Sequence, residues 1–200
     1  TGAAGTYKSA AVFKADGKVE KVLGGHERMV TSVATDGVHI ACGDYSGSIR
    51  LYNAKTFELL GELQHGDCEV YGLALLGDLL VSGGDDNRVK RWSIRELMCT
   101  ATLTEHTGWV VSVDMSEEAI VSGSSDRTAR IWPRDGTTSR HTLQHPEFVN
   151  GLCLAGDVLA TGCFDNVVRM FTVSSGKKTR ELRGHGDRVW GIALCGGVLV

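Results

Sequence analysis

Serine, aspartate and histidine residues recur in this chain as the parts of a hydrolase triad would. Residues 81–93 read VSGGDDNRVKRWS, and residues 121–133 read VSGSSDRTARIWP. Each stretch holds a Ser and an Asp, and a histidine precedes each of them, His65 or His106. In a catalytic triad, a His oriented by an Asp takes the proton of an exposed Ser, which then attacks the substrate. The chain therefore contains either a nucleophile or a repeated structural device.

The recurrence itself argues against catalysis. A triad needs one exposed nucleophile, activated once, beside a pocket for the oxyanion. Here the Ser lies between Val and Gly inside a short apolar run, and the whole unit returns forty residues later. The sequence also lacks a P-loop, a dinucleotide-binding fingerprint and an H-E-x-x-H motif. We therefore expect no enzymatic activity in these residues and no cofactor.

Composition excludes several other classes of function. The 200 residues are 42% hydrophobic and 22% charged with a net charge of −3, which is typical of a folded globular chain. Lys and Arg are scattered, so we expect no nucleic-acid partner, and no apolar run reaches the roughly 20 residues that span a membrane. The six cysteines form no C-x-x-C pair and no zinc spacing, which predicts no metal site and reduced thiols in an intracellular protein, cytoplasmic or nuclear.

Two independent sets of residues repeat with a period of about forty. The histidines that precede an apolar run are separated by 39, 41, 39 and 40 residues: His26, His65, His106, His145 and His185. The aromatic residues that close a later run are separated by 39, 40, 40 and 39 residues: Phe13, Tyr52, Trp92, Trp132 and Phe171. Because both sets keep one period, the chain is a tandem repeat.

Each repeat reads as four short strands. After the His comes an alternating run such as VTSVAT (30–35) or VVSVDM (110–115), then a tight turn and a small-residue run such as LLVSG. A second turn leads to a run ending in the aromatic residue, such as TARIW, and a fourth run leads to the next His. Alternation with period two, bounded by Gly, Asp and Asn, predicts half-buried antiparallel strands. The fold class is therefore all-β.

The unit resembles the WD40 repeat, in which a His, the pattern S-G-x-x-D and a strand-closing aromatic residue follow in this order. The resemblance covers residues 7–200 and recurs five times. Two departures are present: a Gly precedes the His only at Gly25 and Gly184, and no strand-closing aromatic residue is followed by Asp. The resemblance implies a β-propeller, whose four-stranded blades stack radially around a channel.

On this resemblance, residues 1–200 form a single propeller region of four complete blades and two half blades. The expected bounds are 7–25 for the first half blade, 26–64, 65–105, 106–144 and 145–184 for the blades, and 185–200 for the second half blade. Since rings of this family usually hold more blades, we expect a fragment, a partial ring of a seven-bladed propeller. The alternative is a ring of five blades, closed by pairing the two half blades.

The resemblance also implies a structural role for the triad-like residues. In WD40 proteins the His, a strand Ser or Thr, the turn Asp and the strand Trp form a hydrogen-bonded tetrad inside the blade. Carried over, two tetrads are complete and one is partial: His65, Ser82, Asp86 and Trp92; His106, Ser122, Asp126 and Trp132; and His145, Thr161 and Asp165. The first unit keeps His26 but has Cys42, Ser46 and Tyr52 in the other three places.

In the same family, three positions per blade project to a rim that commonly contacts partners. They are here Met29, Thr31, Tyr45, Glu69, Tyr71, Asp85, Trp109, Val111, Ser125, Phe148, Asn150, Phe164, Arg188 and Trp190. Six of these fourteen are large aromatic residues, as in interface hot spots. We therefore expect a non-catalytic scaffold for proteins or peptides that works within a multiprotein complex.

A narrower resemblance leaves an alternative function open. The short connections between first and second strands, such as LLGDLLVSG, look like those of F-box/WD-repeat substrate receptors of ubiquitin ligases. In that group, rim arginines grip phosphorylated segments through paired hydrogen bonds. Only Arg188 occupies an equivalent position here. The alternative is thus a substrate-recognition subunit of a larger enzyme complex.

Overall fold

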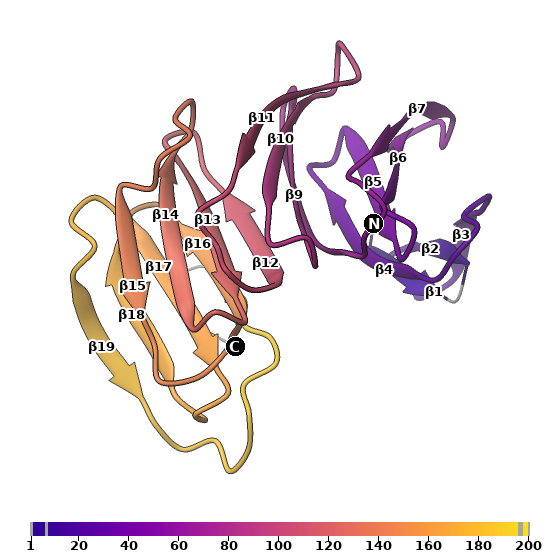
Figure 1. Cartoon of the computed structure of the whole chain (residues 1–200). Helices are drawn as coiled ribbons and strands as arrows, with labels where there is room; N and C mark the ends of the chain where they lie inside the picture. Colours follow the sequence, from indigo (N-terminus) through magenta and orange to yellow (C-terminus); the bar gives the residue numbers. More distant parts are fainter. Residues whose placement is uncertain (1, 7, 196–197, 200) are drawn as a thin grey trace.

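All regular structure in this computed structural model is β-strand (Figure 1). The structure describes residues 2–6, 8–195 and 198–199, and the described strands form six antiparallel sheets. Their strands are β1 (Gly2–Thr6), β2 (Ser9–Phe13) and β3 (Val19–Leu23); β4 (Val30–Thr35), β5 (His39–Asp44), β6 (Ser48–Asn53) and β7 (Leu59–Gln64); β8 (Val70–Leu76), β9 (Leu79–Gly84), β10 (Val89–Ser93) and β11 (Met98–Leu103); β12 (Val110–Met115), β13 (Ala119–Ser124), β14 (Thr128–Pro133) and β15 (His141–Gln144); β16 (Val149–Ala155), β17 (Val158–Cys163), β18 (Val168–Thr172) and β19 (Lys178–Leu182); and β20 (Leu194–Cys195) with β21 (Val198–Leu199).

The four four-stranded sheets follow one another around an arc (Figure 1). Within each sheet the strands lie side by side in chain order, and the first strands β4, β8, β12 and β16 contact one another from sheet to sheet. The sheets are thus stacked face to face, each covering the apolar face of its neighbour. The predicted all-β partial propeller is confirmed.

A tight turn joins the second and third strands of each sheet. In the four four-stranded sheets the third residue of this turn has a left-handed backbone conformation: Gly47 (φ 83°), Asn87 (φ 66°), Arg127 (φ 69°) and Asn166 (φ 66°). Gly and Asn adopt this conformation most readily, whereas Arg does so rarely. In three of the four turns the preceding residue is an Asp, which accepts a hydrogen bond from the N–H two residues on, as Asp126 does from Thr128 at 2.8 Å. This local bond places the turn Asp at the end of the sheet.

A glycine in each second strand sets the distance to the next sheet. A Cβ atom at Gly43 or Gly83 would lie 2.7 or 2.5 Å from the first valine of the following sheet, and one at Gly162 would lie 2.6 Å from Val189, the equivalent valine of the next repeat. These valines are almost fully buried (Val70, Val110 and Val189). Apolar clusters fill the space between successive sheets, for example around Ile131 and Leu159. The close approach of the next sheet explains why small residues recur in the second strand.

The two ends of the described chain differ from the expected half blades. The first sheet has three strands rather than two, because Gly2–Thr6 pairs along the whole length of β2. Near the other end, residues 188–193 carry no strand, although the alternating run VWGIAL (189–194) follows His185 as the predicted first strands follow the other histidines. The Leu194 N–H instead donates to the Cys153 sulfur. The last expected inner strand therefore lies against β16 without completing a ladder.

Candidate functional site

The triad-like residues of the third repeat form a buried chain of hydrogen bonds. The Trp132 indole N–H donates to Ser122 Oγ at 2.9 Å, and Ser122 Oγ lies 2.7 Å from His106 Nε2. The other ring nitrogen, Nδ1, donates to Asp126 Oδ2 at 2.7 Å. Burial alone would raise the pKa of Asp126, but hydrogen bonds from His106 and Thr128 outweigh it and hold this pKa well below its ordinary value. Each polar side-chain atom of Trp132, Ser122, His106 and Asp126 thereby has a hydrogen-bond partner.

The second repeat has the same chain with the imidazole turned over. Trp92 donates to Ser82 Oγ at 2.8 Å, and Ser82 Oγ lies 2.7 Å from His65 Nδ1. It is therefore Nε2 that faces Asp86 Oδ1, at 3.2 Å. Ser82, like Ser122, has no exposed surface, so its hydroxyl cannot meet a substrate. The burial of both serines argues for a stabilising role rather than for nucleophilic catalysis.

The two incomplete repeats find other partners. In the first, His26 Nδ1 lies 2.7 Å from Asp44 Oδ2, so the carboxylate comes from two residues before the expected Ser46. An aspartate in that turn was the signal that sequence reasoning passed over. In the fourth, His145 Nε2 contacts Thr161 Oγ1 at 2.8 Å. Asp165 does not join them.

Asp165 instead pairs with an arginine from the next strand. The two terminal guanidinium nitrogens of Arg169 donate to the Asp165 carboxylate, at 3.0 and 2.5 Å. His145 is left without a carboxylate, and its Nδ1 donates to the Leu143 carbonyl at 3.0 Å. Because burial disfavours the imidazolium, the pKa of His145 falls to about 4. This histidine therefore stays neutral in the folded protein.

In each four-stranded sheet, a β-bulge and a backbone hydrogen bond bring the three predicted rim positions together. In all four complete sheets a register shift leaves one residue of the first strand unpaired, namely Thr31, Tyr71, Val111 or Asn150. Such a β-bulge turns a side chain out of the regular ladder. The turn residue then donates its N–H to the carbonyl of the residue before the first valine: Tyr45 to Met29, Asp85 to Glu69, Ser125 to Trp109 and Phe164 to Phe148, at 3.0–3.2 Å. The fold thus groups each predicted triplet at one end of its sheet.

Eight of the fourteen predicted rim residues line one pocket of about 420 Å³: Tyr71, Trp109, Val111, Ser125, Phe148, Asn150, Phe164 and Trp190. Its aromatic rings pack against one another across sheets. Phe164 and Trp190 meet edge to face at 4.8 Å between ring centroids, and Tyr71 and Trp109 are 6.2 Å apart. Trp109 and Trp190 nevertheless remain 53% and 63% exposed. We call this set of eight residues the aromatic pocket.

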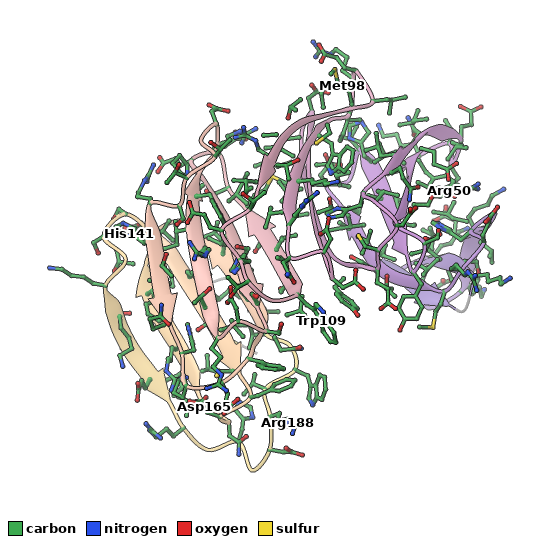
Figure 2. All side chains as sticks on the ribbon, in the orientation of Figure 1. Arg50, Met98, Trp109, His141, Asp165 and Arg188 are labelled. Carbon is green, nitrogen blue, oxygen red and sulfur yellow. The ribbon has the colours of Figure 1, made fainter. Side chains whose placement is uncertain are left out.

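The other six predicted rim residues lie around or beyond the aromatic pocket. Arg188 places its guanidinium 4.9 Å from the Phe164 ring centroid, and Figure 2 shows Arg188 and Trp109 at the same edge of the sheets. On the opposite side of the pocket, the Glu69 carboxylate accepts a hydrogen bond from the Tyr71 hydroxyl at 2.6 Å. The backbone N–H of Glu69 donates to the Asp85 carboxylate. The pocket therefore has a basic and an acidic border.

Met29, Thr31 and Tyr45 do not reach the aromatic pocket. Tyr45 lines a separate, more polar hollow that also includes Glu69, Arg28 and Asp67. Met29 is half-buried, and the Thr31 hydroxyl donates to the Val70 carbonyl of the next sheet at 2.6 Å. The sequence grouped positions that are equivalent by register, whereas the structure separates those of the β4–β7 sheet from the rest.

No described helix provides the long apolar segment that a membrane crossing by a helix requires. The five cysteines whose side chains are described are all free thiols: Cys42, Cys68, Cys99, Cys153 and Cys163. Burial raises the pKa of Cys42 to about 12, which keeps this thiol protonated and unreactive.

Comparisons with known proteins place these features in context. The family model described as WD domain, G-beta repeat (WD40) matches residues 17–53, 57–93 and 97–133. The WD repeat-containing protein pop2 of Schizosaccharomyces pombe is 29% identical over 201 residues, which cover 82% of this chain and 29% of that protein. The DENN domain and WD repeat-containing protein SCD1 of Arabidopsis thaliana is 26% identical over 176 residues, covering 86% and 15% respectively.

Among solved structures, the crystal structure of the computationally designed Ika8 protein superposes with a TM-score of 0.83. It shares 20% sequence identity and matches 98% of this chain and 65% of its own. This similarity concerns the fold alone. The chain spans less than a third of the length of the two natural relatives, 29% and 15%.

Proposed function

The chain belongs to the WD40 family, and on that premise we propose that it is a non-catalytic scaffold that binds proteins or peptides on its rim. The aromatic pocket is the observation that supports this proposal. Exposed tryptophans around a hollow are uncommon on a surface that contacts only water, because large apolar rings gain free energy when a partner covers them. Trp109 and Trp190 are therefore the expected anchors.

The borders of the aromatic pocket indicate how a bound segment would be oriented. Arg188 on one side favours an acidic group of the partner, whereas Glu69 and Asp85 on the other favour a basic one. The apolar pocket between them suits a bulky aliphatic or aromatic side chain. We infer a peptide segment with an apolar anchor between an acidic and a basic residue.

A random-peptide library panned on the immobilised chain tests the proposal. Trp109→Ala should weaken the binding of enriched peptides by at least about thirtyfold, which corresponds to the roughly 2 kcal/mol of a hot spot. Its melting temperature should stay within a few degrees of the wild type, since the ring is half-exposed. Met98→Ala is a matched control, because Met98 is 51% exposed and lies at the opposite edge (Figure 2). Equal binding by both variants, or unfolding of Trp109→Ala, would overturn the proposal.

The alternative, a substrate-recognition subunit of a larger enzyme complex, rests on Arg188. Its exposed guanidinium is able to pair with a phosphate through two hydrogen bonds. Peptides that carry phosphoserine beside the apolar anchor should then bind more tightly than the same peptides with Ser, and Arg188→Gln should remove the difference. Equal affinities for both peptide forms would leave the scaffold as the better proposal.

The compartment follows from the same reasoning and is part of the proposal. Free thiols at Cys42, Cys68 and Cys163 lie inside or beside the sheets. A reducing compartment, cytoplasm or nucleus, keeps such thiols unpaired.

A further inference from the structure

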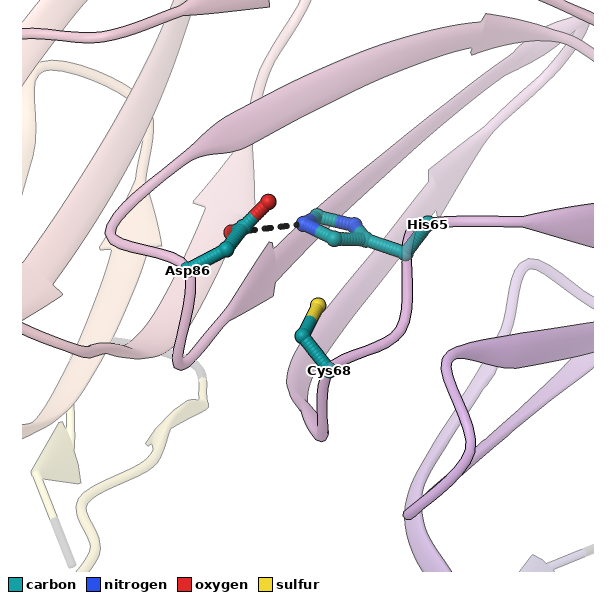
Figure 3. Close-up of side chains that lie close together, drawn as sticks. All are labelled: His65, Cys68 and Asp86. Carbon is teal, nitrogen blue, oxygen red and sulfur yellow. Dashed lines mark hydrogen bonds and ion pairs between the residues drawn. The ribbon is translucent and has the colours of Figure 1, made fainter.

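The second four-stranded sheet brings together three side chains that are able to bind a metal ion. His65 Nε2, Cys68 Sγ and an Asp86 carboxylate oxygen all lie within 4.8 Å of one another (Figure 3). His65 and Cys68 come from the segment that leads into β8, and Asp86 comes from the turn between β9 and β10. The spacing of these residues along the chain matches no zinc pattern, so only the fold shows them as a group.

A missing side chain at Gly84 creates the space between these atoms. A Cβ atom there would lie 2.9 Å from the Glu69 carbonyl oxygen, 3.1 Å from His65 Nε2 and 3.2 Å from Cys68 Sγ. Gly84 has no left-handed backbone, so its conformation alone does not require glycine. At the same register position the other four-stranded sheets carry Asp44, Ser124 and Cys163, opposite the first valine of each sheet.

The β12–β15 sheet shows how the position equivalent to Gly84 is filled when no ligand group is present. The Ser124 hydroxyl donates to the Gly108 carbonyl at 3.0 Å, two residues before Val110. In the second sheet, the residue two before Val70 is Cys68. Cys68 thus stands where the β12–β15 sheet has Gly108, and Gly84 stands where it has Ser124. A hydroxyl that donates to the backbone is absent, and a thiol lies beside an imidazole and a carboxylate instead.

The orientation of His65 suits metal binding. Its Nδ1 faces Ser82 Oγ, whereas the equivalent histidine of the third sheet, His106, presents Nε2 to its serine. Metal-bound histidines ordinarily hold their second nitrogen in such a hydrogen bond. Because a hydroxyl both donates and accepts, Ser82 is able to receive an Nδ1–H when Nε2 gives its lone pair to a metal.

Charge around the three atoms also favours a cation. Asp85 adjoins Asp86, so two carboxylates face the ammonium group of Lys90, which is bound to the His65 carbonyl oxygen and acts on both Cys68 and Asp86. Asp86 is partly exposed, with 22% of its side-chain surface accessible, so an ion has a route of entry.

We propose that His65, Cys68 and Asp86 form a binding site for Zn²⁺ or a similar borderline-soft divalent cation. Imidazole, thiolate and carboxylate are the ligands that zinc accepts, with a fourth position left for water or for a partner's side chain. Tetrahedral zinc holds its ligand atoms about 3.3–3.8 Å apart, given bonds of about 2.0–2.3 Å. His65 Nε2 and Asp86 Oδ1, at 3.2 Å, are already at about this spacing, and the Cys68 sulfur has at most about 1.5 Å to move. On binding, the Cys68 thiol releases its proton to solvent.

Titration of the full chain with Co²⁺, followed by absorbance, tests this site. One equivalent should produce a near-ultraviolet charge-transfer band of a thiolate–cobalt bond, and Zn²⁺ should displace it. Cys68→Ala and the isosteric Cys68→Ser should both lose the band while keeping the wild-type circular dichroism. Cys99→Ser, which removes an exposed thiol elsewhere, should keep the band. The absence of a band in the wild type, or its persistence in both Cys68 variants, would overturn the proposal.

Discussion

Removing one buried hydroxyl, in Ser122→Ala, should destabilise the protein far more than its small size suggests. Ser122 and Trp132 have no exposed surface, and His106 is 4% exposed. The Ser122 oxygen accepts the Trp132 N–H at 2.9 Å and lies 2.7 Å from His106 Nε2. Alanine leaves both nitrogens without this partner, and each buried polar group so orphaned costs about 1–3 kcal/mol. The expected loss in the free energy of unfolding is therefore about 3 kcal/mol.

Urea unfolding followed by circular dichroism measures this loss directly. For a chain of this length, about 3 kcal/mol corresponds to a fall of roughly 6–12 °C in Tm. Ser125→Ala is the matched control, because Ser125 is three residues away and partly exposed on the rim. It should change stability by less than about 0.5 kcal/mol.

A double-mutant cycle with Trp132→Phe separates the hydrogen bond from packing. Phenylalanine keeps an aromatic ring but has no N–H, so Ser122→Ala should cost less in that background, by about 1 kcal/mol. Strictly additive losses, or a Ser122→Ala variant as stable as Ser125→Ala, would refute the reasoning that the buried chain stabilises the sheet.

The remaining predictions concern a neutral histidine, a replaced serine and a small residue between sheets. Burial lowers the pKa of His145 from 6.5 to about 4, so between these pH values the unfolded chain binds a proton that the folded chain does not. The urea midpoint of unfolding should therefore be highest above about pH 6.5 and fall as the pH decreases towards 4. Cys42→Ser should add about 1 kcal/mol to the free energy of unfolding in urea. His26 Nε2 is buried with no hydrogen-bond partner among the described residues, and Cys42 holds the register position of the tetrad serine. Gly83→Ala should lower the free energy of unfolding by roughly 1–3 kcal/mol, since its Cβ would lie 2.5 Å from Val110 Cγ1.

Each of these predictions has a control in the same chain. His145→Gln should flatten the change in stability between pH 6.5 and pH 4, and an unaltered slope would assign it to another group. Cys99→Ser, at an exposed thiol, should leave stability unchanged where Cys42→Ser raises it. Gly186→Ala, with no atom within 4 Å of its Cβ, should have little effect, and equal losses for both glycine variants would contradict the spacing argument.

Much of the fold was accessible from the sequence because the strands are local and repeated. Period-two alternation predicts strands from neighbouring residues alone, and the forty-residue recurrence predicts which positions are equivalent. Asp86 and Asp126 lie where the repeat placed them, six residues before their tryptophans. Equivalence by repeat does not guarantee the same contact, however. Asp165 has the same place in its repeat, but Arg169 four residues later competes for its carboxylate and takes it from His145.

The sequence by itself determined that the chain is a repeated all-β protein and which residues can hydrogen-bond inside each sheet, since those residues are linked by short turns and strand pairing. Only the tertiary structure decided which side chains of different sheets meet. Tyr71, Trp109 and Trp190 line one pocket, whereas Tyr45 lies apart from it. The space beside Cys68 likewise exists only because Gly84 folds against it. Distances between repeats depend on how the sheets pack and twist, and that packing sums many contacts that no single period in the sequence records.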